Sequence, residues 1–360
     1  MTKIAIMGAG LSGLSCAFEL EKNGLSADIF EDRGEVEDRF MNLEGMLDIL
    51  YRPVTDSLAY LADKHGLFLQ PINTIKKLEL NSEKCKKSIE GRMGFVTARG
   101  RHPQALSKQI AKQIKSKLFF DSKRSIHELT KEYDIVVIAL GDGNFTRKLQ
   151  KFSVDVSVTL LGIDIAGSFD PTQLTVFLDN RFAPKGYVYQ MAYDEKAAHL
   201  AIATPQDNAD MQLLKDRLLN HINFSGRITN EFEIRNYVIG RTDCSRIGNM
   251  FFTGNCGGFI MPFLGFGQFG SILSGIYTGK AIALGKDVSK ELQPMKKSYK
   301  LSLNLRRAME CMENDDFDRL VSLMGSALGS RILTDSRYNI LRLGGKLTKP
   351  YAAALSVIRN

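Results

Sequence analysis

The sequence predicts an α/β protein with a Rossmann-like domain that is discontinuous along the chain, and three observations predict it. An apolar strand at Ile4–Met7 runs into a glycine-rich turn and then a helix, which is the order of a Rossmann βαβ unit. Two further apolar strands, Ile135–Ala139 and Met250–Thr253, also end on glycine turns. Because the three turns lie far apart in the sequence, other structure must be inserted between the parts of one parallel sheet.

The composition is that of a soluble globular chain, with 44% hydrophobic and 24% charged residues among 360. The opening, MTKIAIMGAG, is too short and too rich in glycine for the apolar core of a signal peptide, so we expect a cytoplasmic protein. The five cysteines are scattered without a CxxC pair, and the five histidines are scattered too. We therefore expect neither a disulfide framework nor a metal site.

The first glycine turn has the pattern of a dinucleotide site. Gly8, Gly10 and Gly13 form GxGxxG between the first strand and a helix that begins at about Leu11. Gly8 permits the tight turn, Gly10 lets the backbone approach a pyrophosphate, and Gly13 lets the helix pack close to the strand. The N–H groups and the dipole of the helix then bind the diphosphate.

Acidic residues follow the second strand of this unit. Glu31 comes 18 residues after Gly13, where a carboxylate can accept a hydrogen bond from an adenosine ribose, and Asp32 follows it. An NAD domain would continue with alternating strands and helices, but residues 33–67 predict loop and helix, and Lys76–Val96 predicts a strand-rich excursion. A cofactor contacted by three widely separated turns is long, which favours FAD over NAD.

The segment Ile247–Gly279 contains no charged residue and is long enough to cross a bilayer. Its many glycines and its proline would break a membrane helix, so we interpret it as the floor of a flavin site. Gly254 and Asn255 follow a strand and can face the ribityl chain. The loop Gly265–Gly267 can bring N–H groups to the pyrimidine edge, and the helix after it directs its positive end there.

Four stretches resemble the geranylgeranyl reductase family of FAD-dependent oxidoreductases, which have the p-hydroxybenzoate hydroxylase fold. They are LGDG followed by Arg147, ARGRHPQAL, GNCGGFIMPFLGFGQFGSILSG and GYVYQMAY. The resemblance spans nearly the whole chain. It implies an FAD-binding domain at 1–75, 97–150 and 241–288, an antiparallel-sheet substrate domain at 76–96 and 151–240, and a C-terminal helical region at 289–360.

The motifs and the resemblance together imply a set of residues around FAD. These are Gly8, Gly10, Leu11, Ser12, Gly13, Glu31, Asp32, Arg99, Gly141, Asp142, Gly143, Gly254, Asn255, Gly265, Phe266 and Gly267. Arg99 is preferred over Arg101 as the family's arginine at the helix that follows the first excursion. The chain departs from the family at Asn255, where an aspartate is usual, and at Asn42, where archaeal relatives have a cysteine. An asparagine can still bond a ribityl hydroxyl but brings no charge.

Candidates for the substrate cavity are Tyr187, Tyr189 and Glu44. The two tyrosines lie on one face of a predicted strand, where an aromatic side chain serves either the core or a substrate. Glu44 is either an acid near the flavin or a residue that caps or solvates a helix.

Charge is distributed unevenly around a formal net charge of +8. Residues 76–124 carry 14 Lys and Arg against 4 Asp and Glu, and residues 331–360 carry 6 against 1. Neither region has a nucleic-acid-binding motif, so we expect no nucleic-acid partner. The C-terminal segment is amphipathic, and it either caps the core or lies on an anionic membrane surface as a peripheral contact.

The resemblance implies an enzyme that reduces carbon–carbon double bonds of an isoprenoid chain or lipid, with a hydrophobic substrate. No second dinucleotide motif is present, so the resemblance implies an external electron donor such as NAD(P)H or ferredoxin. Two alternatives stay open: an FAD-dependent monooxygenase of an aromatic or polyketide substrate, and a non-catalytic flavin-binding protein associated with membranes. A long apolar tunnel would favour the reductase, and a compact polar pocket would favour the monooxygenase.

Overall fold

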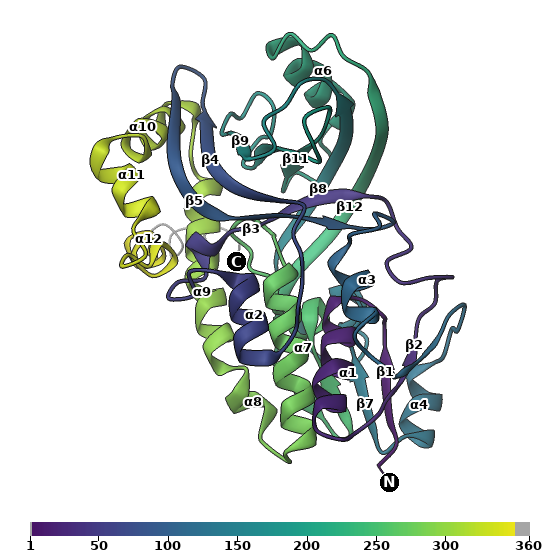
Figure 1. The fold of residues 1–360 in the computed structure, drawn as a ribbon. Coiled ribbons are helices and arrows are strands. Elements are labelled where there is room, and N and C mark those ends of the chain that lie inside the picture. Colours follow the sequence, from purple (N-terminus) through teal and green to yellow (C-terminus); the bar gives the residue numbers. More distant parts are fainter. Residues whose placement is uncertain (1, 350–360) are drawn as a thin grey trace.

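The computed structural model describes residues 2–349 and contains two β-sheets, one above the other, with helices around them (Figure 1). The lower sheet has six strands in the order β13-β14-β7-β1-β2-β6. Its strands are β1 (Ile4–Met7), β2 (Asp28–Phe30), β6 (Lys117–Phe119), β7 (Ile135–Ile138), β13 (Arg246–Ile247) and β14 (Met250–Phe252). All of its neighbouring pairs are parallel except β13 with β14. The predicted α/β fold is therefore confirmed, and each of the three predicted strands that end on glycine turns is present.

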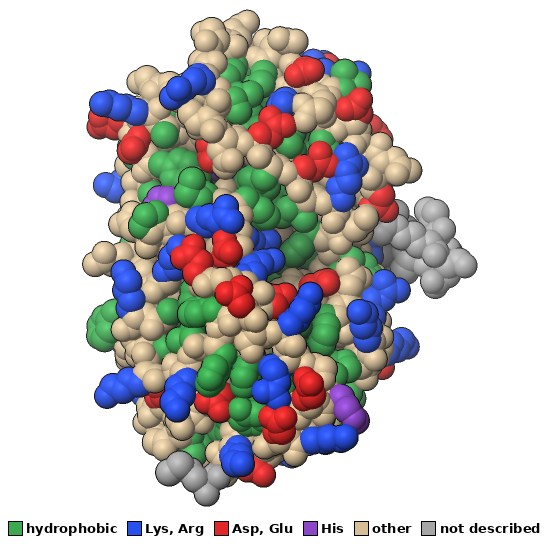
Figure 2. Space-filling view, turned by 90° about the vertical axis from the view of Figure 1, so that its right-hand side faces the viewer, with side chains coloured by type: hydrophobic (Ala, Val, Ile, Leu, Met, Phe, Trp, Pro, Cys, Tyr) green, Lys and Arg blue, Asp and Glu red, His purple; other side chains and the backbone are tan. Residues whose placement is uncertain are grey.

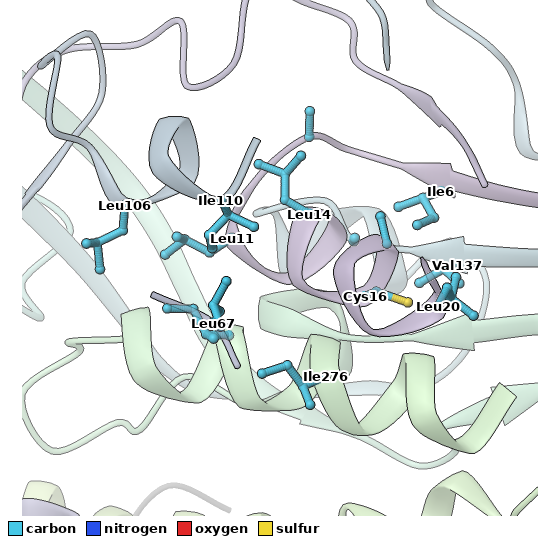
Figure 3. Close-up of a cluster of buried hydrophobic side chains, with 14 of the residues drawn as sticks. Ile6, Leu11, Leu14, Cys16, Leu20, Leu67, Leu106, Ile110, Val137 and Ile276 are labelled. Atoms are coloured by element: carbon cyan, nitrogen blue, oxygen red, sulfur yellow. The ribbon is translucent and has the colours of Figure 1, made fainter. Parts of the chain in front are cut away.

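Helix α1 (Leu11–Lys22) packs directly against α7 (Gln268–Ala283), which lies beside it (Figure 1). A Cβ atom on Gly275 would lie 2.2 Å from the Ser12 carbonyl oxygen, and one on Gly279 would lie 2.6 Å from that of Cys16. Small residues thus let the two helices approach closely. Leu14 and Ile276 fill the core beside this contact (Figure 3). Burying each such side chain stabilises the fold by about 1.5–3 kcal/mol.

The upper sheet has eight strands in the order β12-β8-β11-β10-β9-β4-β5-β3. They are β3 (Asn42–Met46), β4 (Asn73–Asn81), β5 (Lys86–Arg99), β8 (Phe152–Ala166), β9 (Gln173–Phe177), β10 (Tyr187–Ala192), β11 (Ala197–Thr204) and β12 (Ile228–Thr242). The sequence predicted an antiparallel sheet, and the pairs are antiparallel apart from β4 with β9, which is parallel.

Strand β3 lies in a region for which the sequence predicted only loop and helix. Its residues, NLEGM, have low β-propensity, and antiparallel pairing of Asn42–Met46 with β5 makes them a strand. The pairing brings a segment close to the N-terminus into the upper sheet, beside Arg99.

Helices surround both sheets, with α6 above the upper one (Figure 1). Those not yet given are η1 (Asp48–Leu50), α2 (Ser57–His65), α3 (Leu106–Ala111), α4 (Ile126–Glu132), α5 (Gly143–Thr146), α6 (Met211–His221), η2 (Gly254–Gly257), α8 (Val288–Glu291), α9 (Gln293–Glu310), α10 (Asn314–Met324), α11 (Ala327–Thr334) and α12 (Ile340–Leu347). Helices α9 to α12 form the predicted C-terminal helical region. Residues 350–360, the end of the predicted amphipathic segment, lie outside the described residues.

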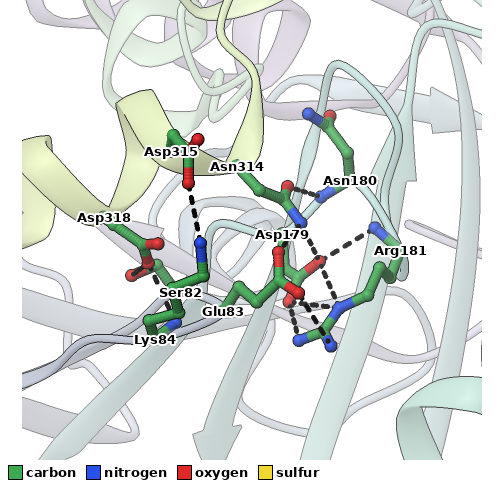
Figure 4. A network of polar contacts seen from close by, with 9 residues as sticks. All are labelled: Ser82, Glu83, Lys84, Asp179, Asn180, Arg181, Asn314, Asp315 and Asp318. Atoms are coloured by element: carbon green, nitrogen blue, oxygen red, sulfur yellow. Dashed lines mark hydrogen bonds and ion pairs between the residues drawn. The ribbon is translucent and has the colours of Figure 1, made fainter.

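A polar network attaches α10 to the upper sheet (Figure 4). Asp315 accepts a 2.8 Å contact from Lys84, and Asp318 accepts a 2.6 Å hydrogen bond from the hydroxyl of Ser82, both on the β4–β5 turn. On the other side, the Asn314 side-chain oxygen accepts from the backbone N–H of Asn180 at 2.9 Å. These contacts attach the C-terminal helices to the upper sheet.

The uncharged segment 247–279 folds into β13, β14, η2, a loop and most of α7 rather than one continuous helix. Within residues 2–349, no helix combines the length and the apolar character that crossing a membrane requires.

Candidate active site

A cavity of about 700 Å³ lies between the two sheets. The lower sheet contributes the glycine turn at 8–12, the acidic residues at 31–32 and the turn at 139–142, while the loop 264–267 and strands β10 and β12 close the other side. Figure 2 shows a recess at mid-height on the face of the molecule that carries β2 and β12, flanked by acidic and basic side chains. A volume of this size is typical of small-molecule and cofactor sites.

The glycine turn has the geometry that its spacing predicts. Gly8 has a φ of +104°, and a Cβ atom on it would lie 2.9 Å from the Ala139 carbonyl oxygen. A Cβ atom on Gly13 would lie 2.1 Å from the Gly8 carbonyl oxygen, so glycine is required where the helix meets the turn. At Gly10, by contrast, no atom lies within 4 Å of the Cβ position. Gly10 therefore leaves open a space within the cavity that any larger side chain would fill.

Two helices begin at the wall of the cavity. Helix α1 starts after Gly10 and α7 starts after Gly267, and both of these glycines line the cavity. No side chain within residues 2–349 caps either helix. The first N–H groups of a helix and the positive end of its dipole attract anions, so two uncapped N-termini make both places suited to negatively charged groups.

The carboxylate of Glu31 braces the glycine turn. Its Oε2 accepts a 2.9 Å hydrogen bond from the backbone N–H of Ala9, and its Oε1 accepts a 3.2 Å bond from that of Arg33. Burial raises the pKa of Glu31, and a hydrogen bond with neighbouring Asp32 raises it further. Glu31 and Asp32 both line the cavity beside the glycine turn. The sequence predicts that the ribose of a dinucleotide binds at this position.

Asn255 shows why an asparagine occupies a position where the family usually has an aspartate. Its side-chain nitrogen donates to two carbonyl oxygens, at 3.0 Å to Gly141 and at 3.1 Å to Val238. A carboxylate cannot donate to either carbonyl. Asn255 lines the cavity, and its buried amide oxygen has no hydrogen-bond partner among the described residues. It is an acceptor that a hydroxyl group in the cavity would satisfy.

Arg99 connects the buried Glu37 and the half-buried Glu44 at the edge of the cavity. It is the last residue of strand β5 rather than part of a helix, and its guanidinium lies 3.0 Å from Glu44 and 3.4 Å from Glu37. Burial lowers the pKa of Arg99, but the two carboxylates outweigh that effect and raise it overall. Burial raises the pKa of Glu37, yet Arg99 and the Gly100 N–H outweigh it and hold that pKa below its ordinary value. Glu44 therefore neither caps nor solvates a helix: it lies on β3 and lines the cavity.

Tyr187 and Tyr189 line the cavity from β10 and also belong to the buried core of the upper sheet. The hydroxyl of Tyr187 donates to the carbonyl oxygen of Leu264, and that of Tyr189 donates to the carbonyl oxygen of Leu43 at 2.9 Å. Burial raises the pKa of both tyrosines, so both stay neutral. Because each hydroxyl is committed to a backbone carbonyl, the two side chains present mainly their ring faces. The ring of Tyr189 packs edge-on against Phe266, with centroids 5.3 Å apart.

Thirteen of the sixteen residues that the sequence assigned to the cofactor line this cavity. The exceptions are Gly13, Gly143 and Gly254, which adjoin it and serve close packing instead. Added Cβ atoms on Gly143 and Gly254 would lie 2.6 Å from the Phe152 ring and 2.4 Å from the Ser12 hydroxyl, respectively.

Sequence reasoning missed several residues that line the cavity. Among them are Glu37, the β12 residues 234–237 and Arg306 on α9. A charged residue in an amphipathic helix is normally expected to face solvent, so nothing in the sequence singled out Arg306. In the case of Glu37, its role depends on Arg99, which is distant in the sequence, and no local pattern reports such a contact.

No family model matches the sequence, and no curated protein matches it closely. Solved structures do match in fold. One is a geranylgeranyl bacteriochlorophyll reductase-like protein from Thermoplasma acidophilum, 17% identical, with a TM-score of 0.67 over 96% of this chain and 99% of that one. Another is a flavin-dependent brominase, 13% identical, with a TM-score of 0.66 over 99% of both chains. A third is 2-methyl-3-hydroxypyridine-5-carboxylic acid oxygenase, 14% identical, with a TM-score of 0.58 over 95% of this chain and 98% of that one.

This chain has the flavin-dependent oxidoreductase fold. The resemblance drawn from the sequence is thus confirmed at the level of fold, and at these identities the likeness establishes the fold alone.

The residues of the cavity fit a flavin dinucleotide. The open space at Gly10 lies beside the uncapped start of α1, which suits a diphosphate. The buried, unpartnered amide oxygen of Asn255 suits a ribityl hydroxyl. The N–H of Gly265 already donates to the Met261 carbonyl oxygen at 3.1 Å. The backbone at Phe266 and Gly267 and the start of α7 remain to offer N–H donors and a positive dipole to the pyrimidine edge of a flavin ring.

Proposed function

We propose that the protein binds FAD in this cavity and reduces carbon–carbon double bonds in an isoprenoid chain. The observation that carries the proposal is the continuity of the cavity, which joins a dinucleotide-binding turn to an apolar compartment under the upper sheet. When bound and reduced by an external donor such as NAD(P)H or ferredoxin, FAD supplies the hydride for such a reduction.

The chain's own residues bind the cofactor and exclude water. The backbone at 8–12 and the dipole of α1 hold the diphosphate, and Glu31 keeps the turn in shape through the Ala9 N–H. The uncapped start of α7 would supply a positive dipole to negative charge on a reduced flavin bound there. The absence of carboxylates from 247–279 supports this role, because an acid there would oppose that charge.

The apolar lining of the upper compartment supports a hydrophobic substrate. Aliphatic and aromatic side chains from β8, β10, β11, β12 and the 260–266 loop surround it, namely Val158, Leu160, Tyr187, Tyr189, Ala203, Ile234, Ile239, Ile260, Leu264 and Phe266. Such a surface binds a hydrocarbon chain by removing its apolar area from water. It holds an alkene in place without supplying polar chemistry of its own.

A monooxygenase acting on an aromatic or polyketide substrate is the second candidate. The buried guanidinium of Arg306 in the same compartment favours it, because a polar anchor can orient a compact ring. The fold is also shared with an oxygenase. The two activities differ in their products, so one assay can separate them.

The deciding experiment uses anaerobic protein reduced with dithionite and incubated with geranylgeranyl lipids. We expect mass spectrometry to show a gain of two hydrogens for each double bond reduced, and no gain when dithionite is omitted. An unchanged lipid, together with substrate-stimulated oxygen consumption in air, would instead support the monooxygenase. A protein that binds FAD which no donor reduces would support the non-catalytic alternative.

We further propose that the C-terminal helices bring the enzyme to an anionic membrane surface, where an isoprenoid lipid would reside. Four leucines of this region are exposed: Leu323, Leu328, Leu343 and Leu347. Exposed Arg331, Arg342, Lys346 and Lys349 lie among them in the sequence. Apolar side chains interspersed with basic ones are typical of helices that lie at a membrane surface.

A further inference from the structure

The apolar compartment contains one buried cation whose charge the proposed chemistry does not use. Arg306, near the C-terminal end of α9, lines the cavity and is only 2% exposed. Its Nε donates to Glu310 at 2.8 Å. Its Nη2 is buried and has no hydrogen-bond partner within residues 2–349. A buried guanidinium nitrogen without an acceptor is costly, so its retention points to a partner that enters the cavity.

The position of Arg306 is well defined. One turn earlier on the same helix, the Ser302 hydroxyl accepts a 3.0 Å hydrogen bond from the backbone N–H of Phe263. This bond ties α9 to the loop that contains Leu264, whose carbonyl oxygen accepts from Tyr187. Arg306 is close enough to Tyr187 to lower the pKa of that hydroxyl, although burial outweighs this effect. The arginine therefore belongs to the compartment under the upper sheet, with the proposed substrate.

The carboxylate beside Arg306 leaves one of its guanidinium nitrogens without an acceptor among the described residues. Arg306 and Arg307 share the single carboxylate of Glu310, whose Oε2 lies 3.2 Å from Arg307. The Nη2 of Arg306 takes no part in these contacts and stays available to a group in the cavity. The hydroxyls of Tyr187 and Tyr189 donate to backbone carbonyls, so they do not compete for an anion.

We propose that Arg306 binds a carboxylate on the substrate, so that the substrate is an unsaturated carboxylic acid with an apolar chain. A carboxylate accepts from guanidinium nitrogens in a charge-assisted hydrogen bond and cancels one positive charge. A diphosphate would place at least two negative charges against this one unpartnered nitrogen, and a neutral alcohol would form a weaker hydrogen bond to it than a carboxylate does. This inference rests on the proposed function for the chain to be reduced, and it adds the group at the end of that chain.

The test compares three ligands that share one farnesyl chain: farnesoate, farnesol and farnesyl diphosphate. Their dissociation constants are measured by equilibrium dialysis against FAD-loaded protein without any reductant. We expect farnesoate to bind at least about tenfold more tightly than either of the others, as one charge-assisted hydrogen bond provides. Because binding is measured without turnover, its result does not depend on the assay for double-bond reduction. A failure of this proposal can therefore be told apart from a failure of the proposed function.

Two variants assign the preference to Arg306. Arg306→Met alone would leave Glu310 buried without this partner and risks unfolding, so it is combined with Glu310→Gln. In a double variant with an unchanged circular dichroism spectrum, farnesoate should lose its advantage over farnesol. Arg307→Gln is the matched control, because Arg307 contacts the same carboxylate and does not line the cavity. It should retain the preference.

Equal affinity for farnesoate and farnesol in the unaltered protein would overturn the proposal. So would tighter binding of the diphosphate, or a preference for farnesoate that survives in the folded double variant.

Discussion

The side-chain nitrogen of Asn255 donates a 3.0 Å hydrogen bond to the carbonyl oxygen of Gly141, joining the second and third glycine turns at the cavity wall. The same nitrogen also bonds the Val238 carbonyl on β12, at 3.1 Å, so one amide links the lower sheet to the upper one. The importance of an amide at this position can therefore be tested by substitution.

Replacing Asn255 by aspartate should therefore harm the protein, although an aspartate is usual in the resembling family. The carboxylate would face two carbonyl oxygens without a donor, which costs about 1–3 kcal/mol of folding free energy. We expect a lower midpoint of thermal unfolding and weaker FAD binding. Asn249 also donates to two carbonyl oxygens, at 3.4 and 3.1 Å, and does not line the cavity. Asn249→Asp should thus lower stability and leave the FAD dissociation constant of the folded protein unchanged. An Asn255→Asp variant of full stability would contradict the assigned hydrogen bonds.

Gly10→Val should abolish FAD binding while the protein still folds. The added side chain enters a space in which no atom lies within 4 Å of the Cβ position, so it meets only the volume assigned to the diphosphate. We expect the stability of the apoprotein to change by less than about 1 kcal/mol. Flavin absorbance after reconstitution and thermal unfolding are the two measurements.

Gly13→Ala is the contrasting variant. Its Cβ atom would lie 2.1 Å from a backbone oxygen, so this substitution should lower the stability of the fold directly. Full FAD occupancy in Gly10→Val would place the diphosphate elsewhere.

Acid should destabilise the protein partly through Glu37. Its pKa is held below the ordinary value of 4.5 in the folded state by Arg99 and the Gly100 N–H. The stability that Glu37 contributes is therefore fully present above pH 4.5, and it is lost as the pH falls through the lower, folded pKa. Glu37→Gln should lower stability at pH 7 by about 1–3 kcal/mol and flatten its dependence on pH below about 5. Glu31, whose pKa is raised, contributes the opposite dependence of stability on pH. The variant and the parent both contain Glu31, so the difference between their stabilities reports Glu37. Unfolding free energies that differ by a constant amount from pH 3 to pH 7 would contradict this.

Binding to anionic liposomes should depend on the basic residues of the C-terminal helices. Arg342, Lys346 and Lys349 are exposed beside the exposed Leu343 and Leu347. Each basic residue near an anionic surface contributes on the order of 1 kcal/mol, screened by salt within a Debye length. Replacing the three by Gln should weaken sedimentation with anionic vesicles by at least about tenfold at low salt. Neutral vesicles should bind little in either case. Equal binding to anionic and neutral vesicles would instead indicate that the helices only cover the upper sheet.

The sequence alone determined the parts of the fold that depend on local patterns. The strands Ile4–Met7 and Ile135–Ile138, helix α1 and the start of α7 agree with prediction to within about one residue, because apolar runs bounded by glycine turns specify both their type and their ends. The roles of Gly8 and Gly13 were predictable for the same reason: backbone geometry at a tight turn excludes every side chain.

Only the tertiary structure decided the contacts between distant segments. The sequence could not show that β3 would pair with β5, that Arg99 would lie between Glu37 and Glu44, or that Arg306 would be buried at the cavity rather than exposed to water. It identified Asn255 as a departure from a family pattern without showing which carbonyls the amide would meet. Ion pairs and buried hydrogen bonds depend on proximity in space. Hydrophobic periodicity and residue propensity do not predict which distant residues will be close. The sequence therefore predicted the glycine turns that form the floor of the cavity, and it did not predict the ion pairs and the buried arginine that line its other side.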